Sequence, residues 1–137
     1  MDYSFRKDHR ITLKKELDLV FSEKQKIHVY PFLSHLHCRP SEFPALKVVI
    51  SVPKKKIKKA HDRNRIKRLI REALRTNKQD LIDLSIQKNI TILFSIVYLW
   101  EEVPSDNLVE IKLKKLLLIT LTLLNKIFQI NHIFLNL

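Results

Sequence analysis

The sequence contains no glycine among its 137 residues. Phosphate-binding loops of the Walker A and dinucleotide-binding types need glycine where the backbone approaches phosphate closely. The nucleophile elbow of α/β-hydrolases needs glycine on both sides of its serine. The absence of glycine therefore excludes three large classes of enzyme site.

The length and composition favour one small globular domain. Apolar residues make up 45% of the chain, which is typical of a folded domain, and 137 residues are too few for two ordinary domains. Cys38 is the only cysteine, which excludes an internal disulfide framework and fits a reducing compartment. No apolar signal-peptide segment precedes the first charges. We therefore expect a cytoplasmic protein.

Positive charge is concentrated in one part of the chain. Residues 47–78 contain thirteen Lys or Arg and two acidic residues, so this segment carries +11 of the formal net charge of +12. Repulsion at that density opposes folding, and a bound polyanion relieves it. The distribution of charge therefore predicts a nucleic-acid partner.

The segment DRNRIKRLIREALR, residues 62–75, places this charge on a helix. At about 100° per residue, Ile66, Ile70 and Leu74 fall on one apolar side and most of the basic residues fall opposite. Arginine grips phosphate with a planar fork, and an asparagine amide both donates and accepts hydrogen bonds. A solvated charged face is the alternative reading. The predicted RNA-binding residues are Arg63, Asn64, Arg65, Lys67, Arg68, Arg71 and Arg75, with Lys54, Lys55 and Lys56 in the loop before them.

Hydrophobic periodicity predicts the order of the elements. We expect helices over residues 12–23, 61–77 and from about 104 onward, and strands over 27–36, 46–52 and 90–99. Pro31 interrupts the first strand and favours an edge strand or a bulge, whereas residues 90–99 are expected to be central. The order is helix, two or three strands, helix, strand, helix. With three strands before the second helix, the order αβββαβα indicates an α/β (α+β) two-layer sandwich with a small mixed four-stranded sheet and about three helices. We expect one domain over residues 1–123 and a C-terminal extension of unknown role over 124–137.

The run RNRIKRLIREALR, preceded by VVISVPKKK, resembles the signature of the bacterial ribonuclease P protein family. That signature reads Arg-Asn-Arg-x-Lys-Arg-x-x-Arg and follows a strand and a lysine-rich connection. The resemblance covers about residues 5–121. It implies a left-handed βαβ crossover, which is an exception to the usual right-handed rule.

The resemblance also implies a function. Members of the family are RNA-binding accessories that help a catalytic RNA bind the 5′ leader of precursor tRNA and cleave it to give the mature 5′ end. The expected partners are therefore the catalytic ribonuclease P RNA and precursor tRNA, with no membrane and no small-molecule substrate. The Mg²⁺ of the reaction is expected to be held mainly by the RNA and not by the protein alone. No catalytic residue is expected on the protein.

In this family a cleft between the signature helix and the sheet holds the single-stranded leader. Unpaired RNA is generally held by basic grooves and by aromatic side chains on which bases stack. The predicted leader-binding residues are Arg10, Phe21, Tyr30 and Phe32. Burial in the core is the alternative for each aromatic residue. Leu17 stands where the family usually carries a second aromatic residue.

Other functions are less well supported by the residues. A general single-stranded or ribosomal RNA-binding protein without catalytic association is the main alternative, and a peripheral membrane protein is another. His35 and His37 lack the second pair of ligands that a structural zinc requires. The carboxylates Glu101, Glu102 and Asp106 are expected in a solvated turn.

Overall fold

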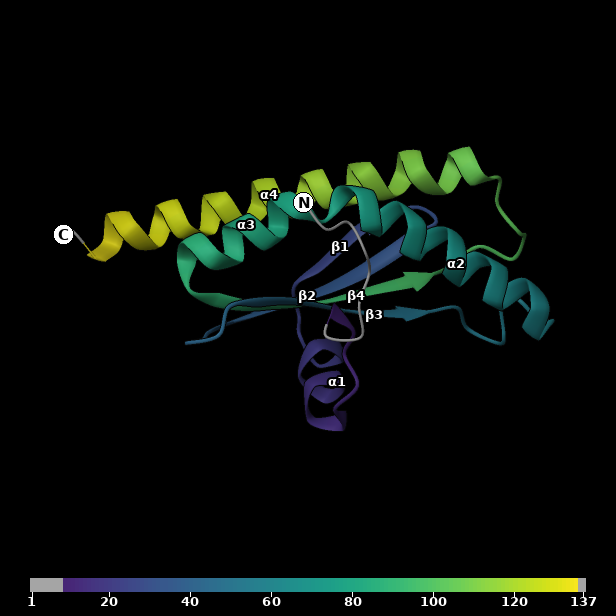
Figure 1. Ribbon diagram of the computed structural model, residues 1–137, viewed down its shortest axis with the longest axis horizontal. Helices are drawn as coiled ribbons and strands as arrows, with labels where there is room; N and C mark the ends of the chain where they lie inside the picture. Colours follow the sequence, from purple (N-terminus) through teal and green to yellow (C-terminus); the bar gives the residue numbers. More distant parts are fainter. Residues whose placement is uncertain (1–8, 136–137) are drawn as a thin grey trace.

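The computed structural model describes residues 9–135, with side chains as far as residue 130. Four helices and four strands lie within this part of the chain (Figure 1). In chain order they are α1 (Lys14–Phe21), β1 (Lys26–Val29), β2 (Phe32–Pro40), β3 (Ala45–Ser51), α2 (Ala60–Asn77), α3 (Gln79–Lys88), β4 (Ile90–Tyr98) and α4 (Asp106–Leu135).

The strands form one mixed sheet in the order β1-β2-β4-β3. β2 is antiparallel to β1 and β4, whereas β3 and β4 are parallel neighbours. Parallel neighbours require a crossover connection, and here α2 and α3 supply it. The predicted α+β class, the mixed four-stranded sheet and the central place of residues 90–99 are confirmed. The left hand of the crossover stays a prediction.

Helices cover both faces of the sheet (Figure 1). Successive side chains of a strand point to opposite faces. In β4, Ile92 and Phe94 belong to the main core, which α2, α3 and α4 also supply. Leu93 instead packs with Ile11 and with Val20 of α1 in a second, smaller cluster. The sheet therefore separates α1 from the basic helix α2.

Residues 27–36, expected to be interrupted at Pro31, form two strands, so that three strands precede α2. β1 and β2 make a hairpin whose turn contains the cis peptide bond between Tyr30 and Pro31. Proline has no backbone N–H to donate to a neighbouring strand. Pro31 therefore lies in the turn and not within a strand.

Helix α3 was not predicted, and it raises the number of helices from three to four. Its apolar residues Leu81 and Leu84 are buried, but the helix has only 10 residues, so the periodic signal is short. The helix ends at Lys88, and the capping residue Asn89 has a φ of 52°, which lies in the left-handed region. Glycine usually occupies that position, and asparagine is the common substitute. In a chain without glycine, Asn89 ends the helix.

Helix α4 continues through the boundary predicted at residue 123. Leu124 is buried in the main core, and the Nζ atom of Lys88 lies 5.7 Å from the centre of the Phe128 ring. The first part of the predicted extension is therefore packed against the domain. Among the described residues, no helix has both the length and the apolar character needed to cross a bilayer.

Candidate RNA-binding surface

Helix α2 divides its side chains between the core and the solvent. Ile66, Ile70 and Leu74 have no exposed surface and pack in the main core. Asn64 and Arg68 are exposed. We call the outward side of α2 the basic face, and its basic residues are Arg65, Lys67, Arg68, Arg71 and Arg75. The predicted sorting of apolar and basic residues on this helix is confirmed.

Most cations of the basic face are not neutralised by the protein. Arg75 is paired with Glu72, with 2.6 Å between Nη2 and Oε1, and this hydrogen bond lowers the pKa of the Glu72 carboxyl. Within the described residues, Lys67 and Arg68 have no carboxylate within 4.0 Å. The face therefore keeps positive charge that an external anion can neutralise.

The loop before α2, residues 54–59, forms the next part of the positive surface, and we call it the lysine loop. Lys54 and Lys55 are exposed, and buried Ile57 anchors the loop in the core. Arg63 donates hydrogen bonds from Nη1 to the backbone carbonyls of Ile57 and Lys58, at 2.9 Å and 2.7 Å. Arg63 thus fixes the shape of the lysine loop, a role that its place in the signature did not indicate.

Arg10 extends the positive surface around the edge of the sheet. It lies beside Val48 of edge strand β3, in a parallel bridge. Arg71 of α2 is partly buried, and its Nε atom is buried without a hydrogen-bond partner among the described residues. Burial, together with the positive charge of nearby Arg10, lowers the pKa of Arg71. A phosphate bound between these two guanidinium groups would reduce their repulsion.

The predicted aromatic contacts divide into exposed and buried residues. Phe21, the last residue of α1, is 41% exposed, and Tyr30 in the β1–β2 turn is 55% exposed. Phe32 is wholly buried, with its ring centre 6.1 Å from that of Tyr98. Its prediction as a leader contact was wrong, because the turn at Pro31 places Phe32 on the strand face that forms the main core.

The space between α2 and the sheet, where a leader cleft was expected, contains buried side chains of the main core. Buried Ile66, Ile70 and Leu74 fill the space between them. Phe21 lies on the opposite face of the sheet, where its ring meets His35 of β2 edge to face at 5.4 Å. Any groove for a leader that uses Phe21 therefore lies on the α1 side.

Comparison with known families identifies the chain. The family model described as Ribonuclease P matches residues 5–116. The chain belongs to the ribonuclease P protein family. It is a protein subunit of ribonuclease P, an endoribonuclease ribonucleoprotein of tRNA processing, and it associates with ribonuclease P RNA.

Similar proteins agree with this family. The ribonuclease P protein component of Porphyromonas gingivalis is 34% identical over 118 residues, which are 85% of each chain. That of Legionella pneumophila is 36% identical over 84 residues, 61% of this chain and 72% of the relative. The ribonuclease P protein structure from Staphylococcus aureus matches with a TM-score of 0.65 and 22% identity, over 83% of this chain and 96% of that one. The last match shows the fold alone.

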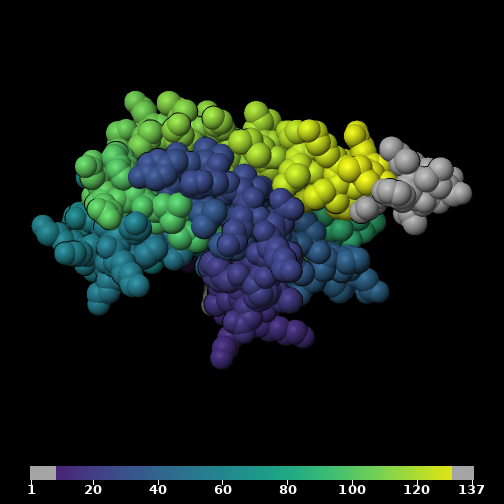
Figure 2. Space-filling model, turned by 180° about the vertical axis from the view of Figure 1, so that it is seen from behind, coloured from purple at the N-terminus to yellow at the C-terminus, as the bar shows by residue number. Residues whose placement is uncertain are grey.

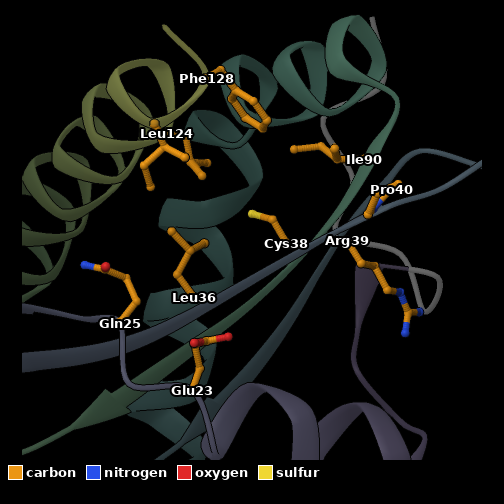
Figure 3. A pocket seen from close by; sticks show the side chains of 10 residues that line it. Glu23, Gln25, Leu36, Cys38, Arg39, Pro40, Ile90, Leu124 and Phe128 are labelled. Carbon is orange, nitrogen blue, oxygen red and sulfur yellow. The ribbon is translucent and has the colours of Figure 1, made fainter. Parts of the chain in front are cut away.

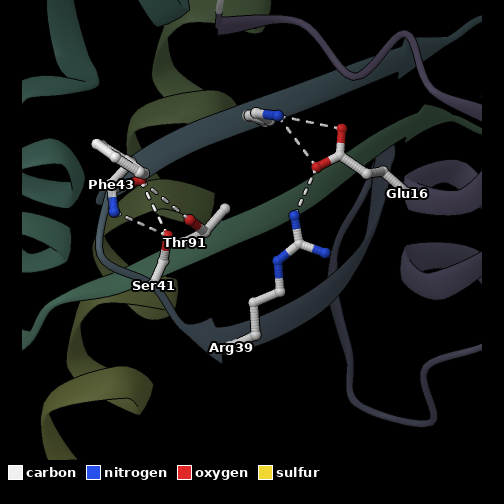
Figure 4. A network of polar contacts seen from close by, with 6 residues as sticks. Glu16, Arg39, Ser41, Phe43 and Thr91 are labelled. Atoms are coloured by element: carbon white, nitrogen blue, oxygen red, sulfur yellow. Dashed lines mark hydrogen bonds and ion pairs between the residues drawn. The ribbon is translucent and has the colours of Figure 1, made fainter.

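In this ribonuclease P protein, a buried carboxylate that was not predicted fixes α1 to the sheet (Figure 4). Glu16 accepts a hydrogen bond from Arg39 of β2 at 2.8 Å and contacts Lys47 of β3 at 3.1 Å. These contacts join α1 to two strands, and so they position Phe21 at the end of the helix. Glu16 shows no distinctive spacing in the sequence, because its partners are 23 and 31 residues away.

The side chains of the two histidines of β2 form hydrogen bonds with other residues of the protein. Nδ1 of His35 lies 2.9 Å from the hydroxyl of Ser95, and Nδ1 of His37 lies 2.8 Å from Glu23. Burial lowers the pKa of His35.

A cavity of about 380 Å³ opens between the end of β2 and α4, and it is lined by Leu36, Cys38 and Phe128 among others (Figure 3). Burial raises the pKa of the Cys38 thiol to about 11, so this cysteine is a poor nucleophile.

Proposed function

We propose that the basic face of α2 and the lysine loop bind ribonuclease P RNA, and that Arg10, Phe21 and Tyr30 hold the 5′ leader of precursor tRNA. The observation that carries this proposal is the set of cations on α2, Lys67, Arg68 and Arg71, that have no carboxylate partner among the described residues. Phosphate oxygens are the partners that such groups lack.

Electrostatics explains why a catalytic RNA gains from this subunit. Catalytic RNA and precursor tRNA are both polyanions and repel each other, so a protein with a net charge of +12 reduces that repulsion. The Mg²⁺ of the reaction is held mainly by RNA phosphates in this proposal. The protein acts in the cytoplasm, where precursor tRNA is processed.

The leader contact depends on exposed aromatic rings. Phe21 is held at the end of α1 by the contact of its ring with His35 and by the anchoring of the helix through Glu16. Tyr30 protrudes from the β1–β2 turn. Stacking of one base on an aromatic side chain contributes about 1–3 kcal/mol. Both rings have enough exposed surface to stack with a base.

A comparison of two tRNA ligands tests the leader contact. The affinity of the reconstituted RNA–protein complex is measured for precursor tRNA with a 5′ leader and for mature tRNA without one. Phe21→Ala or Tyr30→Ala should weaken precursor binding by about fivefold or more and leave mature tRNA binding unchanged. Phe43→Ala is the matched control, because Phe43 is an aromatic residue that is 84% exposed, at the β2–β3 turn.

Two results would count against the leader contact. Equal losses for precursor and mature tRNA would mean that the aromatic residues support assembly and do not touch the leader. A loss with Phe43→Ala as large as that with Phe21→Ala would mean that any exposed aromatic residue has the same effect.

A further inference from the structure

Two carboxylates approach the positive surface, Glu101 from the connection between β4 and α4 and Asp106 from the first residue of α4. Oε1 of Glu101 lies 3.8 Å from Nζ of Lys56, and Oδ1 of Asp106 lies 3.9 Å from Nη2 of Arg65. The two acidic side chains are 75% and 74% exposed. Both distances exceed that of a hydrogen bond. Loose, exposed pairs of this kind contribute little to stability.

Other contacts hold the connection in place. The hydroxyl of Tyr98 donates a hydrogen bond to the backbone carbonyl of Glu102. Val103 packs against the main core, and Pro104 is buried. The two carboxylates are therefore held near the cations by a backbone that does not depend on the ion pairs.

The carboxylates lie beside the surface proposed to bind RNA. The lysine loop and Glu101 line a hollow of about 520 Å³. Its charged lining consists of Lys55, Lys56, Lys58, Lys59, Asp62 and Glu101. Figures 1 and 2 show the start of α2 and the β4–α4 connection side by side at one end of the molecule. An RNA strand that runs from the lysine loop onto α2 meets both carboxylates.

We infer that Glu101 and Asp106 compete with RNA phosphate for Lys56 and Arg65, and so limit the affinity of the subunit for RNA. The inference rests on the proposed RNA-binding role of α2 and the lysine loop. A carboxylate and a phosphate carry the same sign of charge, so both cannot occupy one cation without repulsion. Each carboxylate must be displaced or tolerated when RNA binds.

The inference predicts a gain of affinity, which loss of a structural contact would not produce. Glu101→Gln and Asp106→Asn should each tighten binding of ribonuclease P RNA by roughly two- to fivefold at low salt, the size of an exposed ion pair. Glu42→Gln is the control for the change in net charge. Glu42 is exposed in the β2–β3 turn, at the end of β3 away from the lysine loop.

A double-mutant cycle separates local competition from a general charge effect. In the Arg65→Ala background, Asp106→Asn should tighten binding no more than Glu42→Gln does. Undiminished tightening in that background, or equal tightening by Glu42→Gln in the native background, overturns the inference. No gain of affinity from either acidic substitution also overturns it.

The same experiment separates this inference from the proposed function. Arg65→Ala and Lys56→Ala should each weaken RNA binding if the proposed surface is correct. If they weaken it and the acidic substitutions have no effect, only the competition is refuted. If they leave binding unchanged, the proposed RNA-binding surface fails together with the inference. Thermal melting of each variant confirms that the fold is retained.

Discussion

Substitution of Arg68 by alanine should lower both the affinity for ribonuclease P RNA and its dependence on salt. Arg68 is exposed on α2 and has no carboxylate partner in the described part of the chain, so its whole charge is available to a phosphate. Each neutralised phosphate adds about 0.9 to the slope of log K against log salt on a duplex, and about 0.7 on a single strand.

The salt dependence of one phosphate contact gives the loss of affinity expected for Arg68→Ala. At about 0.1 M salt, a slope of about 0.9 corresponds to roughly eightfold in affinity, or about 1.2 kcal/mol. Arg75→Ala should cost less, because Arg75 already pairs with Glu72 in the free protein. The difference between these two arginines follows directly from their surroundings.

Filter binding of labelled ribonuclease P RNA over a series of salt concentrations measures both quantities. Lys115→Ala is the control, because Lys115 is an exposed residue of α4 with no ion pair among the described residues, and its loss changes the net charge equally. The reasoning is refuted if Arg68→Ala leaves the slope unchanged, or if Lys115→Ala lowers it as much.

Three further predictions concern stability. Phe32→Ala should destabilise the domain by about 3–5 kcal/mol in urea unfolding, because it leaves a cavity at a fully buried site. Substitution of the exposed Phe43 by alanine should change stability by less than about 0.5 kcal/mol. Equal effects of the two substitutions would contradict the assigned burial. Removal of the residues after 123 should lower stability by about 2 kcal/mol or more, because Leu124 is buried in the core, and an unchanged melting temperature would refute this. The hydrogen bond from His37 lowers the pKa of Glu23. Glu23→Gln should therefore reduce stability above the ordinary carboxyl pKa of 4.5, and this reduction should disappear as the pH falls through the lowered pKa. A reduction in stability that grows towards low pH would contradict this prediction.

The sequence was sufficient to predict the elements whose signals are local. Helix α2 shows both a helical apolar pattern and a concentration of charge, and the structure has it within one residue of the predicted start. Strand β4 is a continuous run of β-branched and aromatic residues and is central. In both elements the pattern repeats often enough to exclude other conformations.

The features that were missed depend on contacts between distant residues. Burial of Phe32 follows from the turn at Pro31 and from the packing of β2 beside β4, which no short pattern encodes. The carboxylate of Glu16 is buried because β2 and β3 bring Arg39 and Lys47 to it. The approach of Asp106 to Arg65 brings the start of α4 to α2, although α3 and β4 lie between them in the chain. All three features therefore depend on the tertiary arrangement of the strands and helices.

The rate of precursor tRNA cleavage at low magnesium tests the central claim most directly. Ribonuclease P RNA is assayed alone, with the native protein, and with a variant in which Lys67, Arg68 and Arg71 are all replaced by alanine. The native protein should accelerate cleavage, and the variant, if it melts as a folded domain, should bring the rate back toward that of the RNA alone. Cleavage with the folded triple variant as fast as with the native protein would contradict the assignment of RNA binding to the basic face of α2.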